Sequence, residues 1–123
     1  MSKSTLSWFE LPTLDLGRAV RFYRTVVEAQ IKEEVFAGVP HGIFERLGDD
    51  AITGALIYDE RRKPAHTGTM IYLSTDGRLD ACLRRVEAAG GKIIVGKTHI
   101  GPQGHIAVIA DTEGNHVGLH ARP

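Results

Sequence analysis

The sequence predicts an α+β fold in which two copies of one strand-helix-strand-strand-strand unit pack together as a single domain over residues 1–123. The order of periodic segments is the same in both halves, and the equivalent first strands, at Trp8 and Met70, lie about half the chain apart. Neither half is long enough to bury a stable core alone, so the halves must share one. The first unit covers about residues 6–60, a linker about 59–68, and the second unit about 69–121.

The first unit opens with a strand over Leu6–Leu11, where apolar and polar residues alternate loosely and Trp8 and Phe9 favour strand structure. Pro12 ends this strand, and Thr13 or Asp15 can cap the helix that follows. The apolar residues of that helix recur at helical spacing: Leu16, Ala19, Val20, Phe22, Tyr23, Val26 and Val27.

Three further strands complete the first unit, and turn-forming residues separate them. We expect them at Ile31–Phe36, at Ile43–Leu47 after an entry turn at Pro40-His41-Gly42, and at Ala51–Tyr58. The polar stretch Asp59–Gly68 is interpreted as the linker.

The second unit repeats this order. A strand at Thr69–Thr75 precedes an amphipathic helix, which has apolar residues at Leu79, Cys82, Leu83, Val86 and Ala89 and is closed by Gly90-Gly91. Strands then follow at Lys92–Ile100, His105–Ala110 and His116–His120, joined by turns at 101–104 and 111–115.

Composition excludes several functional classes. Fifteen basic residues balance fifteen acidic ones at a pI near 7.0, whereas a general nucleic-acid binder needs a basic surface. No apolar run is long enough to cross a membrane, and the polar start does not resemble a signal peptide, so we expect a cytoplasmic protein with no membrane partner. Cys82 is the only cysteine, which excludes an intrachain disulfide and a cysteine-rich zinc site, and its helical spacing indicates a core residue.

Several segments, in this order, resemble the vicinal oxygen chelate superfamily, which contains glyoxalase I, bleomycin- and fosfomycin-resistance proteins and extradiol dioxygenases. The matching segments are Trp8–Pro12, Asp15-Leu16, Arg18-Ala19, Phe22-Tyr23, Leu79–Ala81, Val86–Gly91 and Asp111–Asn115. The resemblance covers essentially the whole chain. It implies two tandem βαβββ modules whose curved sheets form a shared cleft, with helices on the outer faces, and many members of this size are homodimers.

Metal-dependent members of this superfamily hold a divalent ion with four His, Gln or Glu side chains from the first and last strands of each module. Alignment puts these positions at Trp8, near Ala55, and at Met70 and Gly118. None of these residues is a ligand for a hard cation, because Trp offers only an N–H donor, Met a soft sulfur, and Ala and Gly no donor atom. We therefore expect the fold without the usual metal site and without a cofactor.

The predicted site is a cleft for a small, partly apolar molecule. Trp8, Met70 and Tyr72 would form its apolar floor, while Glu10, His105 and His120 would orient the ligand. Glu10 is also a candidate general base, because an apolar cleft favours the protonated form of a carboxylate.

Two alternatives remain open at this point. Glu10 and His120, with His105 as a third ligand, could hold a divalent metal in a lyase, isomerase or dioxygenase, or the chain could be a non-catalytic interaction module. The spacing of His116 and His120 suits a metal site only on a helix, and on a strand it separates them by roughly 13 Å. His41, His66 and His99 adjoin loops and turns and are interpreted as surface histidines.

Overall fold

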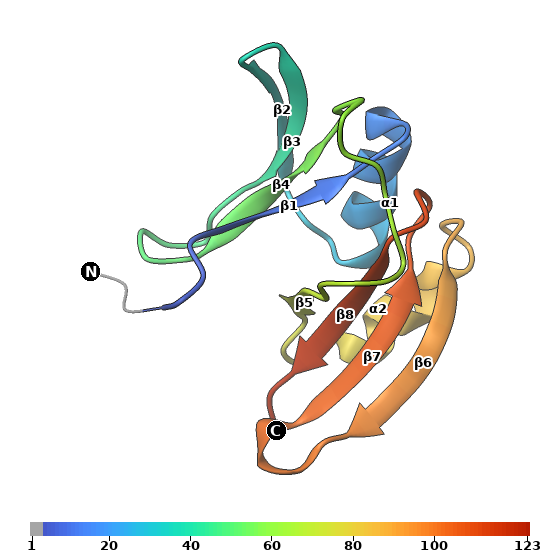
Figure 1. The fold of residues 1–123 in the computed structure, drawn as a ribbon. Coiled ribbons are helices and arrows are strands. Elements are labelled where there is room, and N and C mark those ends of the chain that lie inside the picture. The colour runs from blue at the N-terminus through green and yellow to red at the C-terminus, as the bar shows by residue number, and fades with distance from the viewer. Residues whose placement is uncertain (1–3) are drawn as a thin grey trace.

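The computed structural model describes residues 4–123 as two four-stranded mixed sheets, each carrying one helix (Figure 1). Sheet one has the order β1-β4-β3-β2, with β1 parallel to β4 and the other pairs antiparallel. Its elements are β1 (Trp8–Pro12), α1 (Leu16–Val26), β2 (Ile31–Phe36), β3 (Val39–Phe44) and β4 (Thr53–Ile57).

Sheet two repeats this topology in the order β5-β8-β7-β6, again with a parallel pair, β5 and β8, at one edge. Its elements are β5 (Tyr72–Ser74), α2 (Leu79–Val86), β6 (Lys92–His99), β7 (His105–Ala110) and β8 (His116–Ala121), with a short 3₁₀ helix at Gly101–Gln103. The predicted α+β fold of two βαβββ modules is confirmed, and the two sheets remain open rather than closing on each other (Figure 1).

The largest boundary error of the sequence prediction lies in β3, which begins at Val39 rather than Ile43. A two-residue hairpin at Ala37 and Gly38, both with positive φ (49° and 77°), joins β2 directly to β3. This is the backbone of a type I′ turn, which matches the twist of paired strands. Pro40-His41-Gly42, predicted as an entry turn, is therefore strand, and His41 pairs with Glu34 and Ile57.

The second helix also ends earlier than its apolar spacing predicts. α2 stops at Val86, and the chain then turns with Gly90 at φ 100° and backbone bonds from Gly90 N–H and Gly91 N–H to the carbonyls of Glu87 and Val86. Glycine supplies this left-handed conformation without strain, so the predicted closure at Gly90-Gly91 is confirmed.

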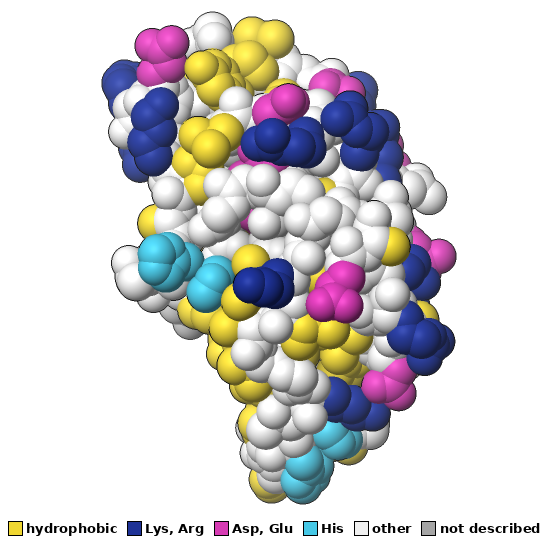
Figure 2. Space-filling model, turned by 90° about the vertical axis from the view of Figure 1, so that its right-hand side faces the viewer, with side chains coloured by type: hydrophobic (Ala, Val, Ile, Leu, Met, Phe, Trp, Pro, Cys, Tyr) yellow, Lys and Arg dark blue, Asp and Glu magenta, His cyan; other side chains and the backbone are white. Residues whose placement is uncertain are grey.

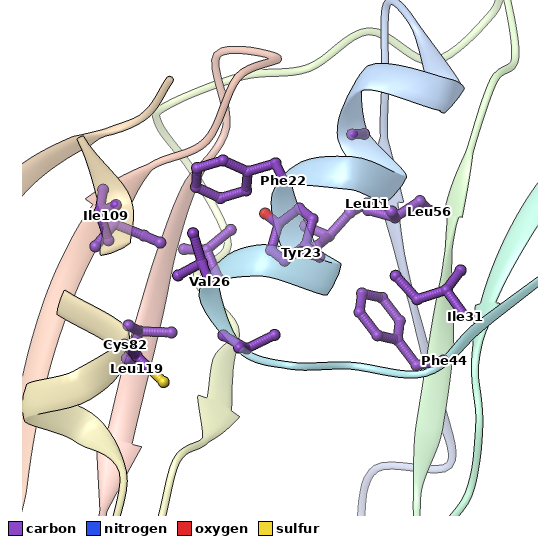
Figure 3. Packing of buried hydrophobic residues seen from close by; sticks show 14 of the residues in the cluster. Leu11, Phe22, Tyr23, Val26, Ile31, Phe44, Leu56, Cys82, Ile109 and Leu119 are labelled. Carbon is purple, nitrogen blue, oxygen red and sulfur yellow. The ribbon is translucent and has the colours of Figure 1, made fainter. Parts of the chain in front are cut away.

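One hydrophobic core holds the two modules together. α1 packs on β3 and β4, α2 packs on β6 and β8, and the helices contact each other, so buried side chains run from sheet one through both helices to sheet two (Figure 3). A Cβ on Gly91, the residue just before β6, would lie 2.7 Å from the ring of Phe22 on α1. Glycine at this position lets the first module's helix approach the second module's sheet.

A buried carboxylate joins the modules at the N-terminus of α1. Glu113, in the turn between β7 and β8, has a fully buried side chain that accepts both guanidinium hydrogen bonds of Arg18, at 2.8 and 3.0 Å. It also accepts the backbone N–H groups of Leu14 and Asp15, at 2.9 and 2.8 Å. These donors belong to the end of the helix that attracts negative charge, so the second module supplies an anion that stabilises the first module's helix.

The same turn makes two more contacts with the first module. Asp111 accepts the hydroxyl of Tyr23 at 2.7 Å, and Asn115 donates its side-chain N–H to the carbonyl of Pro12 at 2.8 Å. Burial and the neighbouring carboxylate raise the pKa of Tyr23 well above its usual value, so this hydroxyl stays protonated as the donor. Residues 111–115, predicted as a simple turn, thus form the polar joint between the modules.

Two arginines of the second module close the opposite end of α1. Arg78 donates to the carbonyl of Val27 at 2.9 Å, and Arg85 donates to the carbonyl of Val26 at 2.8 and 3.2 Å. The last carbonyls of a helix have no partner within the helix, and cations are favoured there. Both ends of α1 therefore depend on groups from the other half of the chain.

We predict that folding stability depends on the charge of Glu113. Burial alone would raise its pKa, but hydrogen bonds from Arg18, Thr112 and the backbone outweigh burial and lower the pKa from 4.5 to about 2. Because the folded pKa is the lower one, this contribution is complete above the unfolded pKa and is lost as pH falls from about 4.5 towards 2. Glu113→Gln should lower the free energy of unfolding at pH 7 by about 2–3 kcal/mol and flatten its decline in that acidic window, as measured by urea denaturation.

The matched control is Glu87→Gln, which removes an exposed carboxylate just after α2. It should change stability by less than about 0.5 kcal/mol and leave the pH profile unaltered. Equal effects of the two substitutions would refute the role assigned to Glu113.

Candidate functional site

Each sheet has one face covered by its helix and one face opposite, here called the open face. In β1, Phe9 and Leu11 pack into the core, so Trp8 and Glu10 project from the open face of sheet one. In β8, Val117 and Leu119 are buried, so Gly118 and His120 belong to the open face of sheet two. By the same alternation, Tyr72 lies on the open face of sheet two, and Met70 just ahead of β5 continues its alternation.

The three residues predicted to form an apolar floor remain partly exposed. Trp8 and Met70 are each 37% exposed and Tyr72 is 49% exposed. Trp8 belongs to sheet one, whereas Tyr72 belongs to sheet two and Met70 lies just before that sheet's first strand. Large apolar side chains that stay accessible are available to a ligand or to another protein surface.

A small polar cluster surrounds Glu10 on sheet one. The indole Nε1–H of Trp8 donates to Glu10 Oε2 at 3.3 Å, and His41 Nε2 lies 3.8 Å from the same oxygen. His41 Nδ1 lies 2.8 Å from the carbonyl oxygen of Val39, and its ring meets Phe36 edge-on at a centroid distance of 5.1 Å. Trp8, Glu10, His41 and Phe36 are hereafter called the Glu10 cluster.

His41 is the site residue that sequence reasoning missed. The interpretation of His41 as a surface histidine is wrong, because its side chain is only 11% exposed and lies in strand β3. The signal was the hairpin turn at Ala37-Gly38, which brings His41 onto the strand beside β4 and onto the face of Glu10.

The ring of Tyr72 covers Gly118 on sheet two. These residues are neighbours in the parallel β5–β8 pair, just as Glu10 and Ala55 are neighbours in the β1–β4 pair. A Cβ on Gly118 would collide with the Tyr72 ring. The space in which a longer side chain at position 118 would begin is therefore already filled.

The other predicted polar residues lie apart from one another. His120 Nε2 is 2.7 Å from the carbonyl of Gln103, and since a carbonyl only accepts, Nε2 carries the proton. His105 faces His99 across the β6–β7 pair, at a ring distance of 5.0 Å. Within residues 4–123, neither histidine forms a hydrogen bond or an ion pair with Glu10, and no three or more His, Cys, Asp or Glu side chains are arranged to hold a metal ion.

One hollow lies away from the open faces. It has a volume of about 490 Å³ and lies between the modules, lined by helix-face residues such as Phe9, Phe44 and Leu73 and bordered by Arg78. A smaller hollow of about 180 Å³ lies beside Glu10 and includes Lys63, Thr69 and His116. A third hollow, of about 430 Å³, lies beside α2 and is lined in part by His105. Glu10 and His105 therefore each border a hollow, but not the same one.

Cys82 is buried, as its helical spacing predicts. Burial raises the pKa of its thiol despite the nearby arginines 78 and 85. A thiol with a raised pKa is a poor nucleophile at neutral pH, so Cys82 is a packing residue.

A family model described as "Glyoxalase/Bleomycin resistance protein/Dioxygenase superfamily" matches residues 5–119. The chain belongs to this superfamily. The family match confirms the resemblance inferred from Trp8–Pro12, Phe22-Tyr23 and Asp111–Asn115. No sequence match to a curated protein is found.

Solved structures similar to this glyoxalase-superfamily chain support the same fold. A glyoxalase/bleomycin resistance protein from Albidiferax ferrireducens aligns with a TM-score of 0.76 at 16% identity, over 98% of this chain and 100% of the other. The fosfomycin resistance protein FosX from Listeria monocytogenes gives 0.68 at 16% identity, over 100% and 94%. A glyoxalase I mutant from Zea mays gives 0.69 at 18% identity, over 94% of this chain but 45% of the longer protein.

Among the residues that the structure describes, no helix has the length and apolar character needed to cross a membrane.

We predict that Gly118→Ala destabilises the protein by about 1 kcal/mol, because the added methyl group displaces the Tyr72 ring. In the Tyr72→Ala background the same substitution should cost much less, which a double-mutant cycle in urea measures.

Gly48→Ala, in the loop between β3 and β4, is the matched control, since a Cβ there meets no atom within 4 Å. It should leave stability within about 0.5 kcal/mol of the unsubstituted protein. A cost for Gly118→Ala that is independent of Tyr72 would contradict the assigned contact.

Proposed function

We propose that this protein binds a small, partly apolar molecule on the open faces of its sheets, as a glyoxalase/bleomycin-resistance-type protein that does not use the metal chelate of its superfamily. The observation that carries the proposal is the partial exposure of Trp8, Met70 and Tyr72 on those faces. Aromatic and thioether side chains bind planar and apolar groups through stacking and dispersion.

The side chains at the usual ligand positions do not fit a hard divalent ion. Ala55 and Gly118 offer no donor atom, Met70 offers a soft sulfur, and the Trp8 N–H is used by Glu10. The Tyr72 ring over Gly118 further supports the proposal, because it occupies the space where a longer ligand side chain would start.

Glu10 is the group best suited to orient a bound molecule. Its carboxylate is 40% exposed, it accepts the Trp8 N–H, and the described residues contain no lysine or arginine ion pair to it. A carboxylate in this position can accept a hydrogen bond from the ligand or take up its proton.

The second candidate, a non-standard metal site in a lyase, isomerase or dioxygenase, draws support from one observation. Glu10 Oε2 and His41 Nε2 are 3.8 Å apart, so a carboxylate and an imidazole face each other. Stable sites use three or four protein ligands, and Glu10 and His41 supply two, so a third ligand would have to come from elsewhere.

We also propose that the protein is a homodimer. All eight residues of β6, an edge strand of sheet two, are exposed, including Ile93, Ile94 and Val95. Viewed from the side on which β6 lies, hydrophobic side chains are exposed among charged ones over the lower half of the molecule (Figure 2). A long edge strand with exposed apolar side chains tends to pair with another strand or to be buried against another protein surface. A second copy of this chain can provide that surface.

We predict that the fluorescence of Trp8, the only tryptophan, responds when a ligand binds. Titration with a panel of small aromatic and amphipathic metabolites should give saturable quenching for at least one compound. Tyr72→Ala and Met70→Ala should each weaken its affinity about fivefold to tenfold, because they remove apolar contact area.

Leu47→Ala is the control, because Leu47 is 92% exposed in the loop between β3 and β4. The affinity of the Leu47→Ala variant for the same compound should be unchanged. No response to any compound would favour a non-catalytic interaction module, and stoichiometric metal in untagged protein that disappears in Glu10→Ala would favour the second candidate.

We predict a solution mass of twice the 13.4 kDa chain, measured by light scattering on a size-exclusion column. Val95→Lys should shift the protein towards the monomer, because it puts a charge into the apolar surface of β6. Leu47→Lys, an equally drastic change on an exposed loop, should leave the dimer intact, and a monomeric unsubstituted protein would overturn the dimer proposal.

A further inference from the structure

We infer that the Glu10 cluster selects a ligand that carries a protonated amine on an apolar body. This inference deepens the proposed function and rests on it, because it names the chemical class that the open face of sheet one would accept. Four features of the site point to this ligand: the tautomer of His41, the spacing of two acceptor atoms, the adjacent aromatic rings and the local charge.

The hydrogen bond of His41 fixes which ring nitrogen carries the proton. The partner of Nδ1 is the carbonyl oxygen of Val39, which can only accept, so Nδ1 must be the donor. In the neutral ring, Nε2 therefore presents a lone pair towards Glu10. The carboxylate opposite it is likewise an acceptor.

The separation of the two acceptors leaves room for a donor. His41 Nε2 and Glu10 Oε2 are 3.8 Å apart, too far for a hydrogen bond between them. A single nitrogen with at least two N–H groups can lie about 2.9 Å from both atoms and donate to each. An ammonium group, with three donors and a positive charge, satisfies both acceptors at once.

Two aromatic side chains flank these acceptors. Trp8 is tied to Glu10 through its indole N–H, and the ring of Phe36 packs edge-on against His41. Both remain accessible, Trp8 at 37% and Phe36 at 48%. An apolar body attached to the ammonium group can lie against these rings, which also attract a nearby cation.

The charge on the open face of sheet one favours a cation. Lys32 and Glu34 neutralise each other in an ion pair of 3.2 Å, which leaves the carboxylate of Glu10 as the uncompensated charge beside His41. Lys63 lines the small hollow beside Glu10, but no ion pair between them is found within residues 4–123. A carboxylate ligand would be repelled by the negative charge of Glu10. It would also offer no N–H or O–H donor to Glu10 Oε2 and His41 Nε2, which both act as acceptors here.

The test compares three phenyl compounds of similar size by quenching of Trp8 fluorescence at pH 7.5: 2-phenylethylamine, 3-phenylpropan-1-ol and 3-phenylpropanoate. We expect the amine to bind about tenfold more tightly than the alcohol, and the carboxylate most weakly. Glu10→Gln should abolish the preference for the amine while leaving the affinity for the alcohol unchanged.

Glu34→Gln is the matched control, because it removes a carboxylate from the same face opposite His41 without contact with Trp8. The Glu34→Gln variant should still prefer the amine. If the preference came only from the overall negative charge of this face, Glu34→Gln would weaken the preference. His41→Phe keeps an aromatic ring against Phe36 but removes the acceptor, and it should reduce amine affinity about fivefold without affecting the alcohol.

The outcomes separate the two proposals. Equal binding of all three compounds, or an amine preference that survives Glu10→Gln, would overturn the inference and leave small-molecule binding intact. Binding of the carboxylate in preference to the amine would overturn it too. No binding of any compound, together with no response across the metabolite panel, would overturn the proposed function itself.

Discussion

The buried carboxylate of Glu113 is the contact on which the rest of the structure depends. It accepts two hydrogen bonds from Arg18, one from Thr112 and two from backbone N–H groups ahead of α1, so five hydrogen bonds from both modules converge on one side chain. A buried charge is tolerated only with such complete pairing. The contact fixes how α1 meets the second module, and the shared core then follows from Phe22 packing onto Gly91.

This way of joining the modules determines where function can lie. Because the helix faces form the shared core, the side chains on the opposite, open faces lie outside it. Trp8 and Glu10 lie on one such face and Tyr72 on the other. The side chains available to bind a ligand are therefore those of alternate residues in β1, β3, β5 and β8. Among them, the Glu10 cluster combines a carboxylate, an imidazole and two other aromatic rings.

Much of the fold could be predicted from the sequence because its signals are local. The apolar spacing of α1, the closing glycines at 90 and 91 and the repeated strand order are all periodic or turn-based patterns. The start of β3 was not predicted because alanine rarely adopts a positive φ, as Ala37 does here. In addition, Pro40 is a residue typical of turns.

The candidate site was predictable only in part. Alternation along β1 was enough to put Trp8 and Glu10 on one face, since that relation concerns residues two positions apart. The approach of His41 to Glu10 depends on the pairing of β1 and β3 with β4 between them. This pairing joins segments far apart in the chain, so local sequence patterns do not predict it. The roles of Glu113 and Asp111 were missed for the same reason, because their partners Arg18 and Tyr23 lie in the other half of the chain.

The contacts of two second-module arginines with the C-terminal end of α1 bear on how the protein folds during synthesis. Arg78 and Arg85 supply the donors for carbonyls at one end of that helix, as Glu113 supplies the acceptor at the other. A nascent chain that has left the ribosome only as far as the linker has the Asp15 cap at the N-terminus of this helix, but it lacks Glu113 and both arginines. The first half can therefore complete the contacts of its helix only after the second half has been translated.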